Sequence, residues 1–388
     1  MVANLSLINL YSINFLLALS TTVGMSILPL LVVDNMGISV MIYGLIEGSC
    51  EFLSSFIKLY SGKIYDKIKN KKILFIVTCI FAFISKIFLF FPLSSAIFAS
   101  KISERIANGL FSSPRDVYAL EGVANRGMSL AIINCSKTLG CVIAPIAVGI
   151  LCHFYGGVEL NMFKILSICV FLTFVALSLS FFIKNKECKI TIDKPISIVK
   201  LLKDKNLSKL YFLIVVYFLA RFNDGFLSLY LKKLGYPVWL YLGTIGFFNT
   251  AMFIISPILG TLLDRKQIKT AGYITIMSFI AFNIVFYTLP GFSNSLAIFA
   301  YVFLGLALWG IQRAGAQVVF CNMVYNNAPT DCKGTAVGLF SCISGLGTFL
   351  SAFICGQVAN IQLEYAFIVS GLFSLMSFVI FQRVSREK

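Results

Sequence analysis

Charged residues are scarce in this sequence. They make up 12% of its 388 residues, whereas 59% are hydrophobic. Soluble domains carry about 25% charged and about 45–50% apolar residues, because water must solvate their surfaces. The shortage therefore excludes an ordinary soluble protein. Apolar segments near the ~20 residues that cross a bilayer recur from end to end, and they are continuous, without the alternation of a membrane β-barrel. We predict an all-α protein that crosses a lipid bilayer many times.

Several signatures of catalytic and metal sites are also missing. The chain has a single histidine, which excludes a histidine metal cluster and a Ser-His-Asp triad. Its eleven cysteines include no Cys-x-x-Cys pair, so no zinc or redox framework is visible. It also lacks the GxxxxGK[ST] motif, which excludes ATP as the direct energy source. The polar connections are too short for a catalytic domain. We predict no enzyme activity, no metal and no cofactor.

The formal net charge is nevertheless +16. In a soluble protein this would suggest nucleic acid, but here the bases gather in short connections between apolar segments, where they set orientation in the membrane. We therefore predict no nucleic-acid partner. Counting bases on alternate sides places both termini and the central connection in the cytoplasm. The Lys-, Ile- and Asn-rich composition suggests a bacterial inner membrane, and we predict a monomer.

The chain divides into twelve predicted membrane spans. Their ranges are 6–33, 39–61, 73–92, 95–120, 128–152, 162–183, 207–232, 237–259, 269–290, 294–322, 334–357 and 363–382. A long hydrophilic connection, 184–209, separates an N-terminal six-helix bundle (1–183) from a C-terminal one (210–388). Lysines alternate with apolar residues from Ile196 to Leu202, which predicts a short amphipathic helix on the inner membrane surface.

The two halves repeat one another. Gly62 and Asp66 recur as Gly260 and Asp264, 198 residues later. A second set recurs 207 residues later: Gly140 and Gly149 match Gly347 and Gly356, and Arg126-Gly127 matches Lys333-Gly334. Equal spacing at nearly equal offsets indicates a duplicated unit. Parallel six-helix repeats are typical of transporters whose site lies between the halves.

Four short patterns resemble the signatures of a known family. The sequences "GKIYDKIKNKK" and "GTLLDRKQIK" each carry a glycine, an acid four residues later and then bases. Arg105 and Gly109 in "RIANG", and then Gly140, Pro145 and Gly149, follow in the expected order. Over essentially its whole length the chain resembles the major facilitator superfamily. The resemblance implies two pseudo-symmetric six-helix bundles and secondary active transport by alternating access.

Two longer stretches resemble one bacterial branch of that family. They are "GLIEGSCEFLSSFIKLYSGKIYDK" and "SSPRDVYALEG", which are similar to a second helix with GLIEG…KLxSG and to a PRDAL element after the fourth helix. Val117 and Tyr118 interrupt the second element, and Asn108 and Phe111 stand where the branch has bases. The resemblance implies a fold and a mechanism but no particular solute.

The repeated Gly and Asp predict a cytoplasmic gate. In the fold that the resemblance implies, Asp66 lies near Gly334 at the start of a later helix, and Asp264 lies near Gly127. An anion at a helix N-terminus gains about 0.3–1 kcal/mol when exposed and up to about 2 kcal/mol when partly buried. Gly62 would let the two backbones approach closely. A simple turn flanked by cytoplasmic lysines explains the bases but not the repetition.

We expect three bases to add ion pairs to this gate: Lys67, Arg115 and Arg265. The Gly140, Pro145 and Gly149 pattern predicts a closely packed and flexible helix, with Gly347 and Gly356 in the second half. In the family this pattern is commonest in exporters, so it favours efflux slightly. Ordinary packing of small residues explains it equally well.

Ionisable residues inside the predicted spans are costly and suggest function. Eight of them are candidates for solute binding or proton coupling: Glu47, Glu51, Lys101, Glu104, Arg105, Arg221, Asp224 and Arg313. In one interpretation the acids are permanently paired and hold helices together. In the other, at least one acid among Glu47, Glu51, Glu104 and Asp224 loses its partner during the cycle and takes a proton.

Buried bases are expected to outnumber buried acids once Lys86 and Lys137 are counted, which favours an anionic solute. The sequence thus predicts a proton-coupled secondary transporter of a small solute, with an anion favoured as the solute and efflux slightly favoured as the direction. Proton-driven import of a metabolite or siderophore is the alternative. A membrane sensor on the same scaffold is a more remote one.

Overall fold

The computed structural model describes most of the chain. The described residues are 2–29, 40–91, 93–121, 123, 125–155, 158–185, 198–221, 226–227, 230–231, 234–236, 238–289, 295–359, 362 and 364–386. Within these ranges the secondary structure is helical and contains no strand. The all-α architecture expected from the continuous apolar segments is confirmed.

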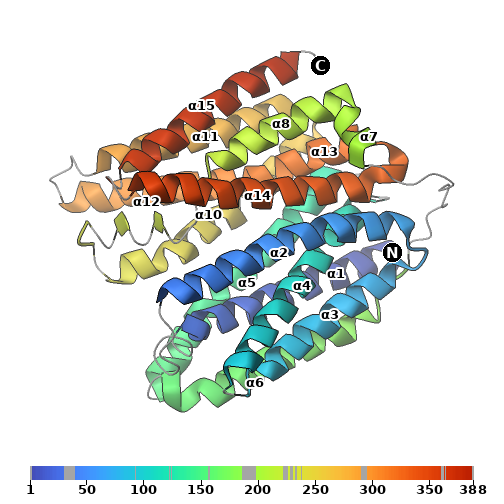
Figure 1. Ribbon diagram of the computed structural model, residues 1–388, viewed down its shortest axis with the longest axis vertical. Helices are drawn as coiled ribbons and strands as arrows, with labels where there is room; N and C mark the ends of the chain where they lie inside the picture. The colour runs from blue at the N-terminus through green and yellow to red at the C-terminus, as the bar shows by residue number, and fades with distance from the viewer. Residues whose placement is uncertain are drawn as a thin grey trace. The chain divides into compact units, whose positions relative to one another are not determined.

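The first half of the chain forms long helices (Figure 1). They are α1 (Val2–Pro29), α2 (Val40–Lys67), α3 (Lys71–Phe88), α4 (Ser94–Leu120), α5 (Arg126–Tyr155) and α6 (Val158–Ser180). A short helix, α7 (Ile198–Lys203), lies in the central connection where an amphipathic helix was predicted. Each of the six long helices overlaps one predicted span.

The second half repeats this arrangement with one composite helix. Its helices are α8 (Lys205–Leu219), α10 (Val238–Asp264), α11 (Ile268–Thr288), α12 (Ser295–Gly315), α13 (Cys321–Asn327), α14 (Lys333–Ala359) and α15 (Tyr365–Arg386). A π-helical turn, η3 (Ala316–Phe320), joins α12 to α13, and a 3₁₀ turn, η4 (Thr330–Cys332), precedes α14. The composite of α12, η3 and α13 overlaps the span predicted at 294–322.

Helix α8 is shorter than predicted. It begins after Asp204, whose side chain accepts hydrogen bonds from the N–H groups of Asn206 and Leu207, both at 3.0 Å. It ends at Leu219, and the described residues 226–227 and 230–231 of the same predicted span are helical again. The carbonyl of Ala220 accepts a hydrogen bond from the hydroxyl of Ser370 at 2.6 Å. A helix can end inside a membrane only where its free backbone groups find partners of this kind.

Eight helical segments of the described chain are long and apolar enough to span a membrane. They come from α1, α5, α6, α10, α11, the α12–α13 composite, α14 and α15. Helix α8 is short, with 15 residues. Helices α2, α3 and α4 each carry at least three charged side chains and are not among these eight segments, although they occupy predicted spans.

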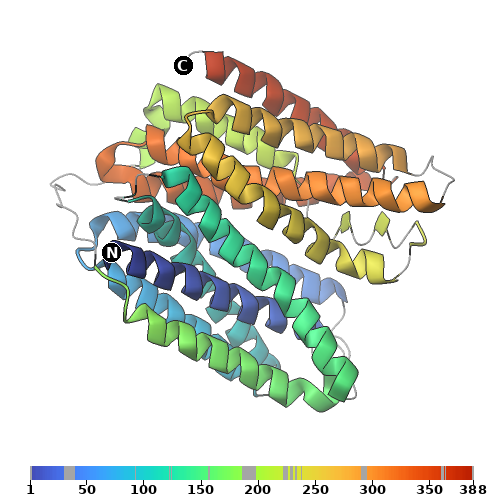
Figure 2. The same cartoon turned by 180° about the vertical axis from the view of Figure 1, so that it is seen from behind.

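The packing of the helices repeats between the halves. In the first half α4 packs against α2 and α3, while α6 packs against α1 and α3. In the second half α12 packs in the same way against α10 and α11, while α15 packs against α8 and α11. These neighbours lie side by side in both views (Figures 1 and 2). The duplication predicted from short motifs therefore extends to the whole packing scheme.

Contacts group the chain into two compact units. The first contains Met1–Glu121, Ser136–Ile196 and Pro329–Ser341, and the second contains Gly122–Cys135, Ser197–Ala328 and Cys342–Lys388. The start of α14 thus belongs to the first unit, and the start of α5 to the second. The division into 1–183, 184–209 and 210–388 stays a prediction from the sequence.

Candidate functional site

The carboxylate of Asp66, at the end of α2, binds the first turn of α14. The first N–H groups of a helix have no partner within it and carry partial positive charge. The N–H of Gly334 donates to Asp66 Oδ1 at 2.8 Å, and the N–H of Thr335 donates to Oδ2 at 2.6 Å. The Thr335 hydroxyl donates to Oδ2 as well, at 2.7 Å. The placement of Asp66 near Gly334, expected from the sequence, is present.

Glycines make this contact possible. A Cβ on Gly62 would overlap the carbonyl of Gly334, and a Cβ on Gly334 would lie 2.5 Å from both the Gly62 oxygen and an Asp66 oxygen. One turn further along α14, a Cβ on Gly338 would lie 2.9 Å from the carbonyl oxygen of Lys58. The backbones of α2 and α14 are therefore in direct contact, as small residues between membrane helices allow.

The second half repeats the contact. Asp264, at the end of α10, accepts hydrogen bonds from the N–H groups of Gly127 at 2.7 Å and Met128 at 2.9 Å, in the first turn of α5. A Cβ on Gly260 would lie 2.8 Å from the carbonyl oxygen of Gly127. Two acids thus each bind the start of a helix from the other sequence repeat. Their role as a gate stays a prediction.

Thr335 was missed by sequence reasoning. It follows Gly334 at the first turn of α14, and its hydroxyl gives Asp66 a third donor. Met128 occupies the equivalent place in α5 and offers only its N–H. A hydroxyl residue directly after the repeated glycine was the available signal.

A partly buried ion pair anchors the end of α2 that carries Asp66. Lys71, at the start of α3, lies 2.8 Å from Glu121, which directly follows α4. The hydroxyl of Tyr65 donates to Glu121 at 2.9 Å, and the Lys71 amine lies 4.2 Å from the centre of the Tyr65 ring. Tyr65 and Lys71 are buried. Asp66 is held next to this network, close enough to be influenced by the charge of Lys71.

Loss of water raises the pKa of Asp66 above its ordinary 3.8. The donors of Thr335 and Gly334 and the charge of Lys71 oppose this effect, but burial outweighs them. The desolvation of the carboxylate therefore offsets part of what its hydrogen bonds contribute.

The three bases expected to add ion pairs to the gate have different surroundings. Arg115 in α4 forms an ion pair with its neighbour Asp116 at 2.7 Å and donates to Asn14 in α1 at 2.9 Å. Asn14 in turn donates to Ser136 in α5 at 2.7 Å. Arg115 thus ties α1, α4 and α5 together within the first unit. Lys67 and Arg265 have exposed side chains.

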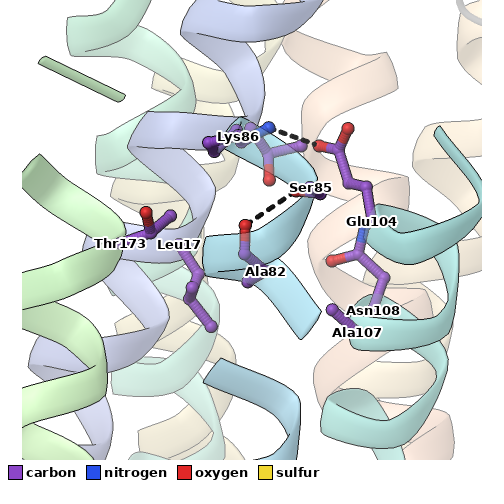
Figure 3. A pocket seen from close by; sticks show the side chains of 9 residues that line it. Leu17, Ala82, Ser85, Lys86, Glu104, Ala107, Asn108 and Thr173 are labelled. Atoms are coloured by element: carbon purple, nitrogen blue, oxygen red, sulfur yellow. Dashed lines mark hydrogen bonds and ion pairs between the residues drawn. The ribbon is translucent and has the colours of Figure 1, made fainter. Parts of the chain in front are cut away.

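A second cluster of charge lies inside the first unit, among α1, α3, α4 and α6. Lys86 of α3 and Glu104 of α4 form an ion pair at 3.2 Å, and both are buried. Lys101 and Arg105 of α4 are buried too. The pair borders a small cavity, whose other polar lining comes from Thr21, Ser85, Asn108 and Thr173 (Figure 3).

Other predicted site residues are only partly described. The side chains of Glu47 and Glu51, and the whole of Asp224, lie outside the described residues. Arg221 and Arg313 are half-buried, and their guanidinium groups lie over the rings of Phe218 and Phe248, at 5.6 and 4.8 Å from the ring centres.

The expectation that Lys137 is buried was wrong. Its side chain is exposed, although its neighbour Thr138 is buried, because successive residues of α5 point about 100° apart around the helix. Lys137 therefore does not add to the buried bases of the described part of the chain. Among the described residues of the predicted spans in the first half, the buried bases are Lys86, Lys101, Arg105 and Arg115.

The predicted glycines of α5 and α14 lie at close helix contacts. A Cβ on Gly140 would lie 2.9 Å from the backbone of α1 at Phe15 and Leu19. A Cβ on Gly347 would lie 2.7 Å from Phe218 of α8. The two repeats thus share this contact as well. The surroundings of Pro145, Gly149 and Gly356 lie outside the described side chains.

Comparison with known proteins agrees with this architecture. An uncharacterized MFS-type transporter of Methanocaldococcus jannaschii, MJ1317, is 26% identical over 383 residues, which cover 94% of this chain and 91% of the relative. The human organic anion transporter MFSD10 superposes with a TM-score of 0.75 at 16% identity, over 98% of this chain and 99% of that one. A bacterial homologue of the iron transporter ferroportin, in an outward-facing state, gives 0.75 at 14% identity over 100% of both chains.

The two structural matches, at such low identity, show the fold alone. The family is shown by the sequence itself, because the sequence model of the Major Facilitator Superfamily matches residues 10–352. With its repeated helical packing and its apolar spans, the chain is a multi-pass membrane protein with the fold of secondary transporters. It belongs to the Major Facilitator Superfamily.

Proposed function

We propose that this chain moves a small anionic solute across the membrane by alternating access, driven by protons. In this proposal the contacts of Asp66 and Asp264 keep the predicted cytoplasmic side closed. The solute is bound between the repeats, and a buried acid takes up the coupling proton. The proposed location is a bacterial inner membrane, with both termini in the cytoplasm. We place the chain in the family branch that has the GLIEG and PRDAL-like elements, and we propose that it is a monomer.

The observation that carries the proposal is the repeated contact between a carboxylate and a helix start. Asp66 joins α2 of the first repeat to α14 of the second, and Asp264 joins α10 of the second to α5 of the first. A contact that links two repeats must break when they separate on that side. Each of the two contacts therefore favours the state of an alternating-access cycle in which it is formed. The size of the preference is the difference in the free energy of that contact between the two states.

Buried charge supports proton coupling and an anionic solute. Glu104 lies with three buried bases in the interior of the first unit. A protein rarely places such groups at membrane depth unless they serve transport. Their net charge is positive, which would attract an anion to a low-dielectric interior.

Two observations favour opposite directions of transport. Gly140 of α5 packs closely on α1 and belongs to a sequence pattern that is commonest in exporters, which favours efflux. The cluster around Glu104 favours uptake, because protonation of this acid would raise the positive charge of the interior and so strengthen the binding of an anionic solute elsewhere in the protein. Coupling between two bound species is reciprocal, so the anion would also strengthen proton binding. A proton and an anion that bind together move together, which makes proton-driven import the second candidate.

Reconstitution into proteoliposomes tests the proposal. A panel of labelled organic acids, phosphorylated metabolites and carboxylate siderophores would be offered with and without an imposed pH gradient. We expect flux of at least one anion that rises with the gradient and disappears when a protonophore collapses it. Protein-free vesicles are the control. The orientation of the gradient that drives accumulation separates import from export. Absence of gradient-dependent flux for the whole panel would favour the sensor interpretation instead.

A further inference from the structure

We propose that Glu104 takes up the coupling proton, that Lys86 is its counter-ion, and that the polar cavity beside them allows the pair to separate. This inference rests on the proposed proton coupling and names its site. The sequence left four acids open for this role and offered Lys86 no particular partner.

The pair occupies the middle of a helix bundle. The Lys86 amine lies 3.2 Å from Glu104 Oε1, and Figure 3 shows the two side chains pointing toward one another from α3 and α4. Lys86 is 1% exposed and Glu104 is 8% exposed. A Cβ on Gly24 of α1 would lie 3.3 Å from the Lys86 amine, so this glycine leaves room for the charged group.

The cavity distinguishes this pair from a purely structural one. A buried ion pair that only holds helices together is expected to be enclosed by close-packed groups, because separating the charges leaves each without a partner. Here the cavity adjoins both Lys86 and Glu104. Hydroxyl and amide oxygens of Thr21, Thr173 and Asn108 line it. They can accept hydrogen bonds from the ammonium when Glu104 becomes neutral.

The size of the cavity sets what it can hold. It has room for about one water molecule, which needs two to four polar partners to be stable. The lining supplies such partners, so a single water can bridge Glu104 to the other polar groups. The cavity is far too small for the transported solute. It therefore serves the proton and not the cargo.

Titratable groups on several of the neighbouring helices surround Glu104. On its own helix, α4, Lys101 and Arg105 are the nearest bases, and on α3 the base is Lys86. On α6 the thiol of Cys169 is close enough to interact with both members of the pair. Helix α1 contributes no titratable group to the cavity. Helix α2, which packs on α4, carries Glu47 and Glu51, whose side chains lie outside the described residues.

The proposed step is one proton transfer. A proton reaches the Glu104 carboxylate through the cavity water, and a bond forms between the proton and a carboxylate oxygen. The acid becomes neutral, while Lys86 keeps its own proton and its positive charge. The ion pair is replaced by hydrogen bonds from the ammonium to the cavity oxygens. The net charge of the cluster rises by one, and it returns to its earlier value when the proton leaves.

Infrared difference spectroscopy of the purified full-length protein tests this with the proton as the probe. Lowering the pH should produce the high-frequency carbonyl stretch of a buried carboxylic acid in the wild type. Glu104→Gln should lose this band, whereas Glu364→Gln, at the start of α15 and outside the cavity, should keep it. The desolvated carboxyl of Asp66 can give a similar band, so the comparison is also made with Asp66→Asn present. Persistence of the band in the double variant Asp66→Asn with Glu104→Gln would overturn the inference.

The role of Lys86 has its own readout. The ammonium favours the ionised form of Glu104, so in Lys86→Met the band should appear at higher pH, by on the order of one pH unit, a tenfold change in proton affinity. Lys164→Met, an exposed lysine of α6, should leave the midpoint unchanged. An unchanged midpoint in Lys86→Met would overturn the role of Lys86.

Failure to fold need not obscure the result. If Glu104→Gln cannot be purified because it leaves Lys86 without a carboxylate, the double variant Lys86→Met with Glu104→Gln removes both charges and should lack the band. The inference and the proposed function fail separately. Gradient-driven flux with a band that does not belong to Glu104 refutes the inference alone. A band that titrates as expected without gradient-driven flux refutes proton-driven transport alone.

Discussion

The hydroxyl of Thr335 lies 2.7 Å from a carboxylate oxygen of Asp66, and the equivalent contact is missing at Asp264. Met128 stands in the place of Thr335 and contributes only its backbone N–H, at 2.9 Å. The duplicated contacts are thus unequal, with three donors at Asp66 and two at Asp264. The inequality makes the two copies controls for one another.

Asp66→Asn should shift the protein toward the state that is open on the predicted cytoplasmic side. An amide offers one acceptor oxygen to three donors and turns its own N–H₂ toward them, and a buried donor without an acceptor costs about 1–3 kcal/mol. The measurement is labelling of a cysteine engineered into the predicted cytoplasmic cavity, on a background without accessible native cysteines. Asp331→Asn, an exposed acid in η4, is the matched control. Equal labelling of all three proteins would rule out the gate.

Thr335→Val should weaken the Asp66 contact while Met128→Thr strengthens the Asp264 contact. Valine has the shape of threonine but removes one hydrogen bond to a carboxylate, which contributes about 1.5–3 kcal/mol. The same labelling assay should show more access in Thr335→Val and less in Met128→Thr. Opposite signs are the decisive feature, because a general loss of stability would increase access in both variants.

Gly62→Ala and Gly260→Ala should destabilise the protein and open the same side. The added methyl group would overlap the facing helix at Gly334 or Gly127, and forced overpacking costs about 1–3 kcal/mol. Gly246→Ala in α10 is the control, since a Cβ there meets nothing within 4 Å and alanine favours the helix. Thermal unfolding in detergent measures the difference. Gly62→Ala as stable as Gly246→Ala would contradict the close approach.

Glu121→Gln should loosen the end of α2 that carries Asp66. It leaves the buried Lys71 without its carboxylate partner. Breaking a fully buried pair on one side costs about 3–5 kcal/mol, so the cost here, where the Glu121 side chain is 22% exposed, should be below about 3 kcal/mol. The double variant Lys71→Met with Glu121→Gln should recover much of the loss, because no charge is left unpaired. Thermal unfolding of the wild type, the single variant and the double variant measures this. A double variant less stable than the single one would show that the pair does not act as a unit.

Much of the fold could be predicted because its causes are local in the sequence. Hydropathy over about 20 residues marks the helices, since a bilayer requires satisfied backbone groups and apolar side chains in each span. The glycines and acids at positions 62, 66, 260 and 264 were visible as a repeat, and the structure places each acid at a helix start. The hydrogen bond from Ser370 to the carbonyl of Ala220, directly after α8, was not visible, because it joins residues that are 150 positions apart.

The candidate site could be predicted only in part. Ionisable residues inside spans were identifiable by their cost in a membrane. Their pairing was not, because the partners of an acid depend on how its helix is rotated and which helix lies beside it. Arg115 was expected at the gate but pairs with Asp116 and Asn14, and Lys137 was expected to be buried but is exposed.

The sequence by itself determined that this chain is helical, that it lies in a membrane and that it is duplicated, because composition and short motifs carry those properties. Only the tertiary structure showed that Lys86 of α3 pairs with Glu104 of α4, and that Thr335 contacts Asp66, 269 residues away in the sequence. The physical reason is that a side chain's partner is chosen by helix rotation and close packing. Both depend on contacts made along the whole length of several helices at once.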